Sequence, residues 1–69
     1  MKISARNQLR GTITDIKVGA VNSIVAIKSG DATIKASITN EAVEELGLKV
    51  GSEAYAIIKA SNVMVGVDH

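Results

Sequence analysis

The sequence predicts a mainly β fold, a small barrel of five strands with one short helix between the third and fourth strands. Two observations support this. The apolar residues are chiefly β-branched, with nine Ile and eight Val against three Leu, and Tyr55 is the single aromatic residue; such side chains pack well on a pleated sheet. Apolar and polar residues also alternate with a period of two over most of the chain, and only one short stretch has helical spacing.

Three strands are predicted in the first 39 residues. The first covers residues 9–18, and its alternation slips by one residue near Asp15, as a β-bulge would cause. The second covers residues 23–28 and has apolar side chains on both faces, which indicates that both of its faces are covered. Residues 29–31 form a hairpin turn, because their central glycine can take the positive φ that tight turns need. The third strand covers residues 32–39.

Residues 39–47 are predicted to form a helix of about two turns. Thr39 or Asn40 caps its start, and Gly47 ends it. Its buried stripe is expected to consist of Val43, Leu46 and Leu48.

Two further strands are predicted, over residues 53–59 and 63–67. The order of three strands, a helix and two strands is the connectivity of a Greek-key barrel of the OB kind. No linker or change of composition divides the chain, so we expect residues 1–69 to form a single OB-like domain.

The small size of the chain predicts an oligomer. A 69-residue domain buries a small core. The sequence has no cysteine and one histidine, His69, so neither a disulfide nor a His/Cys zinc site can support the fold. We find no motif that gives His69 a role. Association with other copies is the remaining common support.

Composition and charge exclude several classes of protein. With 46% hydrophobic residues the chain is too apolar for a disordered segment, yet its apolar runs are too short for a membrane span. A net charge of +1 gives no general field for nucleic acid or an anionic membrane. The first residues lack the apolar core of an export signal, so we expect a cytoplasmic protein.

Side chains suited to catalysis are scarce, whereas hydrogen-bond donors cluster at the ends of predicted elements. We expect no enzymatic activity, because the sequence has no cysteine and most carboxylates fall on the helix or at turns. The donor clusters are residues 4–8, 39–40 and 59–62, where free backbone N–H groups add to the side chains. This combination indicates a small anion that only accepts hydrogen bonds. Each cluster alone also has a structural explanation, as a frayed terminus, a helix cap or a solvated loop.

These segments resemble the molbindins, small molybdate-binding proteins made of a single Mop or TOBE domain. The strongest signatures are Ser-Ala-Arg-Asn-Gln at residues 4–8 and Lys-Ala-Ser at residues 59–61. Further similarities are Gly-Ala-Val-Asn at 19–22, Ile-Thr at 38–39, Leu-Gly-Leu at 46–48, Tyr-Ala-Ile-Ile at 55–58 and Val-Met at 63–64. The resemblance extends over essentially the whole chain and implies the stand-alone form, without an ATPase or DNA-binding part.

The resemblance also implies an assembly and a site. It implies a homohexamer, a trimer of dimers, that binds molybdate or tungstate at subunit interfaces and needs no organic cofactor or metal ion. One subunit would supply Ser4 and Arg6 with backbone donors from Ala5 and Asn7. The neighbouring subunit would supply Thr39, Lys59, Ala60 and Ser61. The turn formed by Gly19, Ala20, Val21 and Asn22 resembles segments near additional oxyanion sites of the family.

The function that follows is storage and buffering of molybdate or tungstate in the cytoplasm, and the sequence does not distinguish the two ions. One alternative is a regulatory module that senses the oxyanion and acts on a partner protein. Another is a binder of single-stranded nucleic acid, which many OB barrels are. That alternative is weaker, because Tyr55 is the only aromatic side chain available for base stacking.

Overall fold

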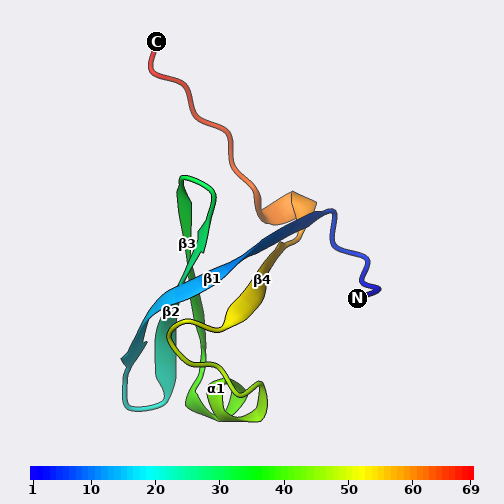
Figure 1. Cartoon of the computed structure of the whole chain (residues 1–69). Coiled ribbons are helices and arrows are strands. Elements are labelled where there is room, and N and C mark those ends of the chain that lie inside the picture. Colours follow the sequence, from blue (N-terminus) through cyan, green and yellow to red (C-terminus); the bar gives the residue numbers. More distant parts are fainter.

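The computed structural model describes residues 1–69 as one curled antiparallel sheet with a short helix at one end (Figure 1). The sheet has four strands in the order β3-β2-β1-β4. No helix is both long and apolar enough to cross a membrane. The elements are β1 (Asn7–Val18), β2 (Asn22–Ser29), β3 (Ala32–Thr39), helix α1 (Asn40–Glu45), β4 (Glu53–Ile58) and a 3-10 turn, η1 (Ala60–Asn62).

The predicted bulge in the first strand is confirmed. Ile13 pairs with Ile27, and the next pair joins Asp15 to Ala26, so Thr14 is an extra residue in β1. An extra residue bends the strand and increases its twist. The long β1 can therefore pair with β2 along one part and with β4 along another, and the sheet curls into a half-barrel.

The inner face of the half-barrel carries the core. Ile13, Val25, Ile27 and Ala56 form a buried cluster contributed by β1, β2 and β4. On the opposite face of β2, Ala26 is buried but Ile24 is 41% exposed. The expectation that both faces of this strand are covered is therefore met only in part.

Of the two predicted caps the structure uses Thr39 as the N-cap, and Asn40 is the first residue of the helix. It ends before Gly47, which has a positive φ of 64°. Val43 and Leu48 pack against the core cluster. Leu46 is 68% exposed, so its predicted burial is wrong. It is the C-cap residue and lines the open groove described below, beyond the closed part of the core.

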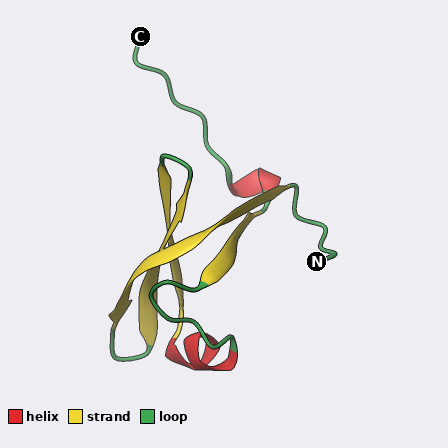
Figure 2. Ribbon diagram, in the orientation of Figure 1, coloured by secondary structure: helices red, strands yellow, loops and turns green.

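The fifth strand predicted over residues 63–67 is absent, which corrects the sequence-based expectation of five strands. Figure 2 shows this segment as an extended tail that leaves the sheet after η1. Its alternation is suited to a strand, but a strand also needs a neighbour with which to pair its backbone. Within one chain the tail has no such neighbour, and Met64 and Val65 are each 92% exposed.

Gly11 allows β1 and β2 to approach closely. A Cβ atom at this position would lie 2.3 Å from the carbonyl oxygen of Lys28 and 2.9 Å from Cγ2 of Ile27. We predict that Gly11→Ala lowers the free energy of unfolding by about 1–3 kcal/mol, the usual cost of overpacking. Urea denaturation at one protein concentration measures the loss. Gly66→Ala is the control, since a Cβ there meets no atom within 4 Å; equal effects of both changes would contradict the steric explanation.

Candidate functional site

The pairing of β1 with β4 brings two predicted donor clusters together within one chain. Asn7, the first residue of β1, is opposite Ile58, the last residue of β4. The Asn7 side-chain amide also donates to the Ile58 carbonyl at 3.1 Å. Residues 4–6 therefore lead into the sheet at the same end at which residues 59–61 lead out, as Figure 1 shows. We call residues 4–6 and residues 59–61 together the donor end of the sheet.

The turn after β4 leaves backbone donors available. In η1 the Asn62 N–H donates to the Lys59 carbonyl at 2.9 Å, and the Val63 N–H donates to the Ala60 carbonyl at 3.2 Å. The preceding N–H groups, those of Ala60 and Ser61, make no hydrogen bond within the chain, as is usual for the first groups of a helical turn. The side chains of Lys59 and Ser61 are exposed beside them.

The segment before β1 is likewise exposed at Ser4 and Arg6, while Ala5 is half-buried. The Gln8 side-chain amide donates to the Ala5 carbonyl at 3.1 Å, which holds the segment in a turn. Neither Arg6 nor Lys59 forms an ion pair within the chain. Both cations are therefore free of an internal counter-charge.

Thr39 keeps a hydrogen that it can donate. Its Oγ1 accepts the N–H of Ala42 at 3.0 Å, so the oxygen acts as the acceptor of a helix cap. A hydroxyl group has one hydrogen in addition to its lone pairs. The exposed Thr39 hydroxyl can therefore cap the helix and donate to an anion simultaneously.

Residues 19–22 form a tight turn that Asn40 fastens to the start of α1. The Gly19 N–H donates to the Asn22 carbonyl at 2.9 Å. The Asn40 side chain donates to the Gly19 carbonyl at 2.9 Å and accepts from the buried Ser23 hydroxyl at 2.5 Å. The sequence analysis missed this Ser23–Asn40 pair. The available signal was a serine within an otherwise apolar stretch, a polar group that needs a partner when it is buried.

Thr39 lies far from the donor end. It is opposite Asn22 in the β2–β3 ladder, next to the Val18 end of β1, whereas Lys59 follows the residue opposite Asn7 at the other end of β1. At roughly 3.3 Å per residue, a strand of this length separates its ends by several times the diameter of a small oxyanion. Within one chain Thr39 and Lys59 therefore lie near opposite ends of β1. Their assignment to one oxyanion site stays a prediction.

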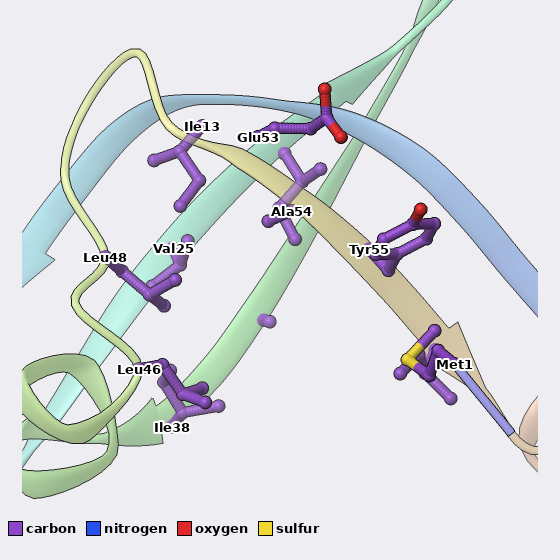
Figure 3. Close-up of a pocket in the computed structure, with 12 residues that line it drawn as sticks. Met1, Ile13, Val25, Ile38, Leu46, Leu48, Glu53, Ala54 and Tyr55 are labelled. Carbon is purple, nitrogen blue, oxygen red and sulfur yellow. The ribbon is translucent and has the colours of Figure 1, made fainter. Parts of the chain in front are cut away.

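The concave face of the half-barrel is an apolar groove rather than an anion site. It encloses about 330 Å³, and 11 of its 12 lining residues are hydrophobic. Figure 3 shows Leu46, Leu48 and Ile38 at one end, and Tyr55 with Met1 at the other. The exception, Glu53, is a carboxylate and would repel an anion. We call this feature the apolar groove.

Arg10 and Glu53 form the one ion pair of the structure, with Nη2 donating to Oε2 at 2.8 Å. This hydrogen bond, aided by the charge of the guanidinium, lowers the pKa of the Glu53 carboxyl and raises the pKa of Arg10. A carboxyl with a lowered folded-state pKa stabilises the protein above its unfolded-state pKa, and this contribution is lost as the pH falls through the folded-state value.

We therefore predict that Glu53→Gln lowers the Tm slightly at neutral pH, and that the difference from the wild type disappears in acid. Both side chains are exposed, so the effect is small. Thermal denaturation between about pH 3 and 7 measures it, a range that spans ordinary carboxyl pKa values. Glu45→Gln is the control, because Glu45 makes no ion pair. A Tm difference for Glu53→Gln that grows in acid would contradict the prediction.

Comparison with known proteins gives consistent matches. The TOBE domain model matches residues 3–65. A probable molybdenum-pterin-binding protein of Haemophilus influenzae is 56% identical over 69 residues, covering 99% of this chain and 100% of that protein. Molybdenum-pterin-binding protein 1 of Clostridium pasteurianum is 42% identical over 66 residues, covering 94% of this chain and 97% of that protein.

Solved structures agree with these sequence matches. MopII from Clostridium pasteurianum has a TM-score of 0.89 and 40% identity, covering 96% of this chain and all of that one. The cytoplasmic molybdate-binding protein ModG, solved with molybdate bound, has a TM-score of 0.94 and 51% identity. This match covers 99% of the present chain and 49% of the ModG chain.

Proposed function

The chain belongs to the TOBE domain family, and from this premise we propose that it binds molybdate or tungstate between subunits of a homo-oligomer and so stores and buffers the ion in the cytoplasm. The observation that carries the proposal is the donor end. There Ser4, Arg6, Lys59 and Ser61 lie at one end of the sheet with free backbone N–H groups and no carboxylate among them. The names of the relatives support the choice of ligand.

The proposed donors bind the ion through three kinds of group: cationic side chains, hydroxyl groups and backbone N–H groups. Arg6 and Lys59 offset the charge of the dianion through charge-assisted hydrogen bonds, which are the strong ones. The hydroxyl groups of Ser4 and Ser61 donate one hydrogen each. The Ala60 N–H makes no hydrogen bond within the chain and can donate to the ion. The backbone donors at Ala5 and Asn7 are those that the family resemblance implies. No bond is made or broken, and the ion is released by mass action as its free concentration falls.

The position of Thr39 supports a site shared between subunits. Because Thr39 lies at the other end of β1, its hydroxyl can reach a donor end only from a second copy. The core also indicates association, since only 6 of the 69 residues are buried in the isolated chain. A chain with so small a core needs further burial to be stable. We propose a hexamer, and we propose the turn at residues 19–22 as part of additional oxyanion sites.

Calorimetric titration of anion-free protein tests this function. We expect molybdate and tungstate to bind tightly, sulfate weakly and phosphate least. Light scattering on the same sample should give a mass several times the 7.2 kDa of one chain. A monomer at micromolar concentration would refute the subunit-interface site, and equal affinity for all four anions would refute a site built for molybdate. Binding of molybdate only together with a partner protein would favour the sensing alternative.

A further inference from the structure

A polar cluster outside the proposed set of donors joins the start of the helix to the turn between β1 and β2. Asn40, the first residue of α1, makes three hydrogen bonds in this cluster. Its backbone N–H donates to the Val21 carbonyl at 2.8 Å. Its side-chain amide donates to the Gly19 carbonyl at 2.9 Å and accepts from the Ser23 hydroxyl at 2.5 Å. The helix and the turn therefore lie side by side at one end of the sheet (Figure 1).

The partners of Asn40 determine how its side chain is oriented. A backbone carbonyl can only accept a hydrogen bond, so the amide nitrogen of Asn40 faces Gly19. The amide oxygen then faces Ser23, whose hydroxyl donates its single hydrogen to it. Ser23 is 1% exposed, so water is not an alternative partner for this hydroxyl. One arrangement of the Asn40 side chain therefore satisfies all three groups.

Stability alone does not explain a polar pair at this place. Ser23 lies on the same face of β2 as Val25, a residue of the core. A buried hydroxyl is costly unless it is hydrogen-bonded, and replacing both partners of such a bond with apolar groups can be nearly neutral. Hydrogen bonds add a direction that apolar contacts lack. The pair is therefore better explained by the orientation that it gives to the start of the helix.

The start of the helix needs such a tie. Helix α1 has six residues and none of them is fully buried. Helices of this length are unstable by themselves in water, so their position depends on what holds them. Thr39 directly precedes Asn40, and its Oγ1 accepts the Ala42 N–H at 3.0 Å. The direction left for the Thr39 hydrogen therefore depends on where the first turn of the helix lies.

The Ser23–Asn40 pair and the Thr39 hydroxyl belong to different faces of the sheet. Ile38 pairs with Ser23, and Thr39 pairs with Asn22. Residues directly opposite each other share a face. Ser23 is on the buried face, whereas Thr39 and Asn22 are exposed. Asn40 is engaged with the buried face, so it acts on an anion at Thr39 through the position of Thr39.

We propose that Asn40, held by Ser23, is a positioning residue of the oxyanion site, which fixes Thr39 so that its hydroxyl can donate to the ion. This inference rests on the proposed function, in which Thr39 is one of the donors. Neither Asn40 nor Ser23 contacts the ion. The same hydrogen bonds hold the turn at residues 19–22 against the helix.

Calorimetric titration of Asn40→Ala with molybdate, well below the Tm of the variant, tests the proposal. We expect the affinity to fall about 2- to 12-fold, the change that corresponds to losing one neutral hydrogen bond. The Tm should fall too, because the Ser23 hydroxyl is left buried without a partner. Ile34→Val is the matched control, since Ile34 packs against the core cluster and takes no part in these hydrogen bonds. It should lower the Tm and leave the affinity unchanged. An unchanged affinity in Asn40→Ala, or an equal loss in the control, would overturn the proposal.

A second variant separates orientation from stability. Ser23→Ala combined with Asn40→Leu replaces the polar pair with apolar side chains and leaves no buried hydroxyl unpaired. Gly19 is exposed, so water can replace the amide at its carbonyl. We expect the Tm to return towards that of the wild type while the affinity for molybdate stays low. Recovery of both would show that the pair contributes stability only.

Hydrogen exchange of the anion-free protein tests the positioning without a ligand. The Ala42 N–H donates to Thr39, so its protection reports how firmly the cap is held. We expect faster exchange at Ala42 in Asn40→Ala and in the double variant, but not in Ile34→Val. Unchanged protection at Ala42 in Asn40→Ala would overturn the proposal. Lost protection there, together with a wild-type protein that does not bind molybdate, would refute the proposed function alone.

Discussion

Replacing Lys59 with alanine is expected to weaken molybdate binding by roughly 10- to 150-fold, because a hydrogen bond to a charged group is worth about 1.5–3 kcal/mol. Lys59 directly follows β4 at the donor end, is exposed and makes no ion pair within the chain. Its ammonium group is therefore available to the dianion. Calorimetric titration measures the affinity, and an unchanged Tm of the anion-free protein shows that the variant is folded.

Lys17→Ala and Lys28→Ala are matched controls, since each removes the same formal charge from an exposed position in a strand. These side chains act on the anion only through a field screened by salt, so each change should alter the affinity little. Equal losses for all three lysines would show that general electrostatics holds the anion and that the donor end is not its site.

The features that the sequence predicts correctly are those decided by neighbouring residues. The third strand was expected over residues 32–39 and is observed over that range, because strict alternation defines one buried face. The bulge near Asp15 appears as a slip in the same alternation. Of the two predicted candidates for the helix cap, Thr39 and Asn40, it is Thr39 that accepts the N–H of Ala42. Each of these features is local in the chain.

The prediction for residues 63–67 was wrong for a physical reason. Their alternation is compatible with a strand, but pairing is a contact between distant segments, and no local pattern states whether the partner belongs to the same chain. The four-residue connection at 59–62 is long enough for a hairpin, yet the structure uses it for the turn η1.

The candidate site was predictable as separate segments but not as an arrangement. The donor clusters were recognised from their residue types and their positions at element ends. The register of β1 with β4 joins segments about fifty residues apart in sequence, and it places residues 4–7 beside residues 59–61. The separation of Thr39 from both follows from the length of β1. Neither the register of β1 with β4 nor the distance between the two ends of β1 can be obtained from the periodicity of the sequence.

The second large effect concerns anion selectivity, where we expect phosphate to bind far more weakly than molybdate at both pH 6 and pH 8. The proposed site includes no carboxylate or carbonyl acceptor, and its hydroxyl groups are assigned as donors to the ion. Each proton on phosphate would therefore be poorly paired, at a cost of about 1–3 kcal/mol. Dihydrogen phosphate carries two such protons, and its lower charge also weakens its attraction to Arg6 and Lys59. Lowering the pH should therefore not improve phosphate binding. Competition of phosphate and sulfate against bound tungstate measures this.

Sulfate has no proton at either pH and should compete better than phosphate throughout, although its bonds are shorter than those of molybdate. Molybdate affinity should stay nearly constant across the range, because lysine and arginine side chains ordinarily titrate well above it, and His69 is not among the proposed donors. Phosphate that outcompeted sulfate, or that gained affinity towards pH 6, would show that an acceptor lines the site. Glu41 would then be the first residue to replace, since it lies in the first turn of the helix that Thr39 caps. A loss of phosphate binding in Glu41→Gln would place that acceptor and exclude a site made of donors alone.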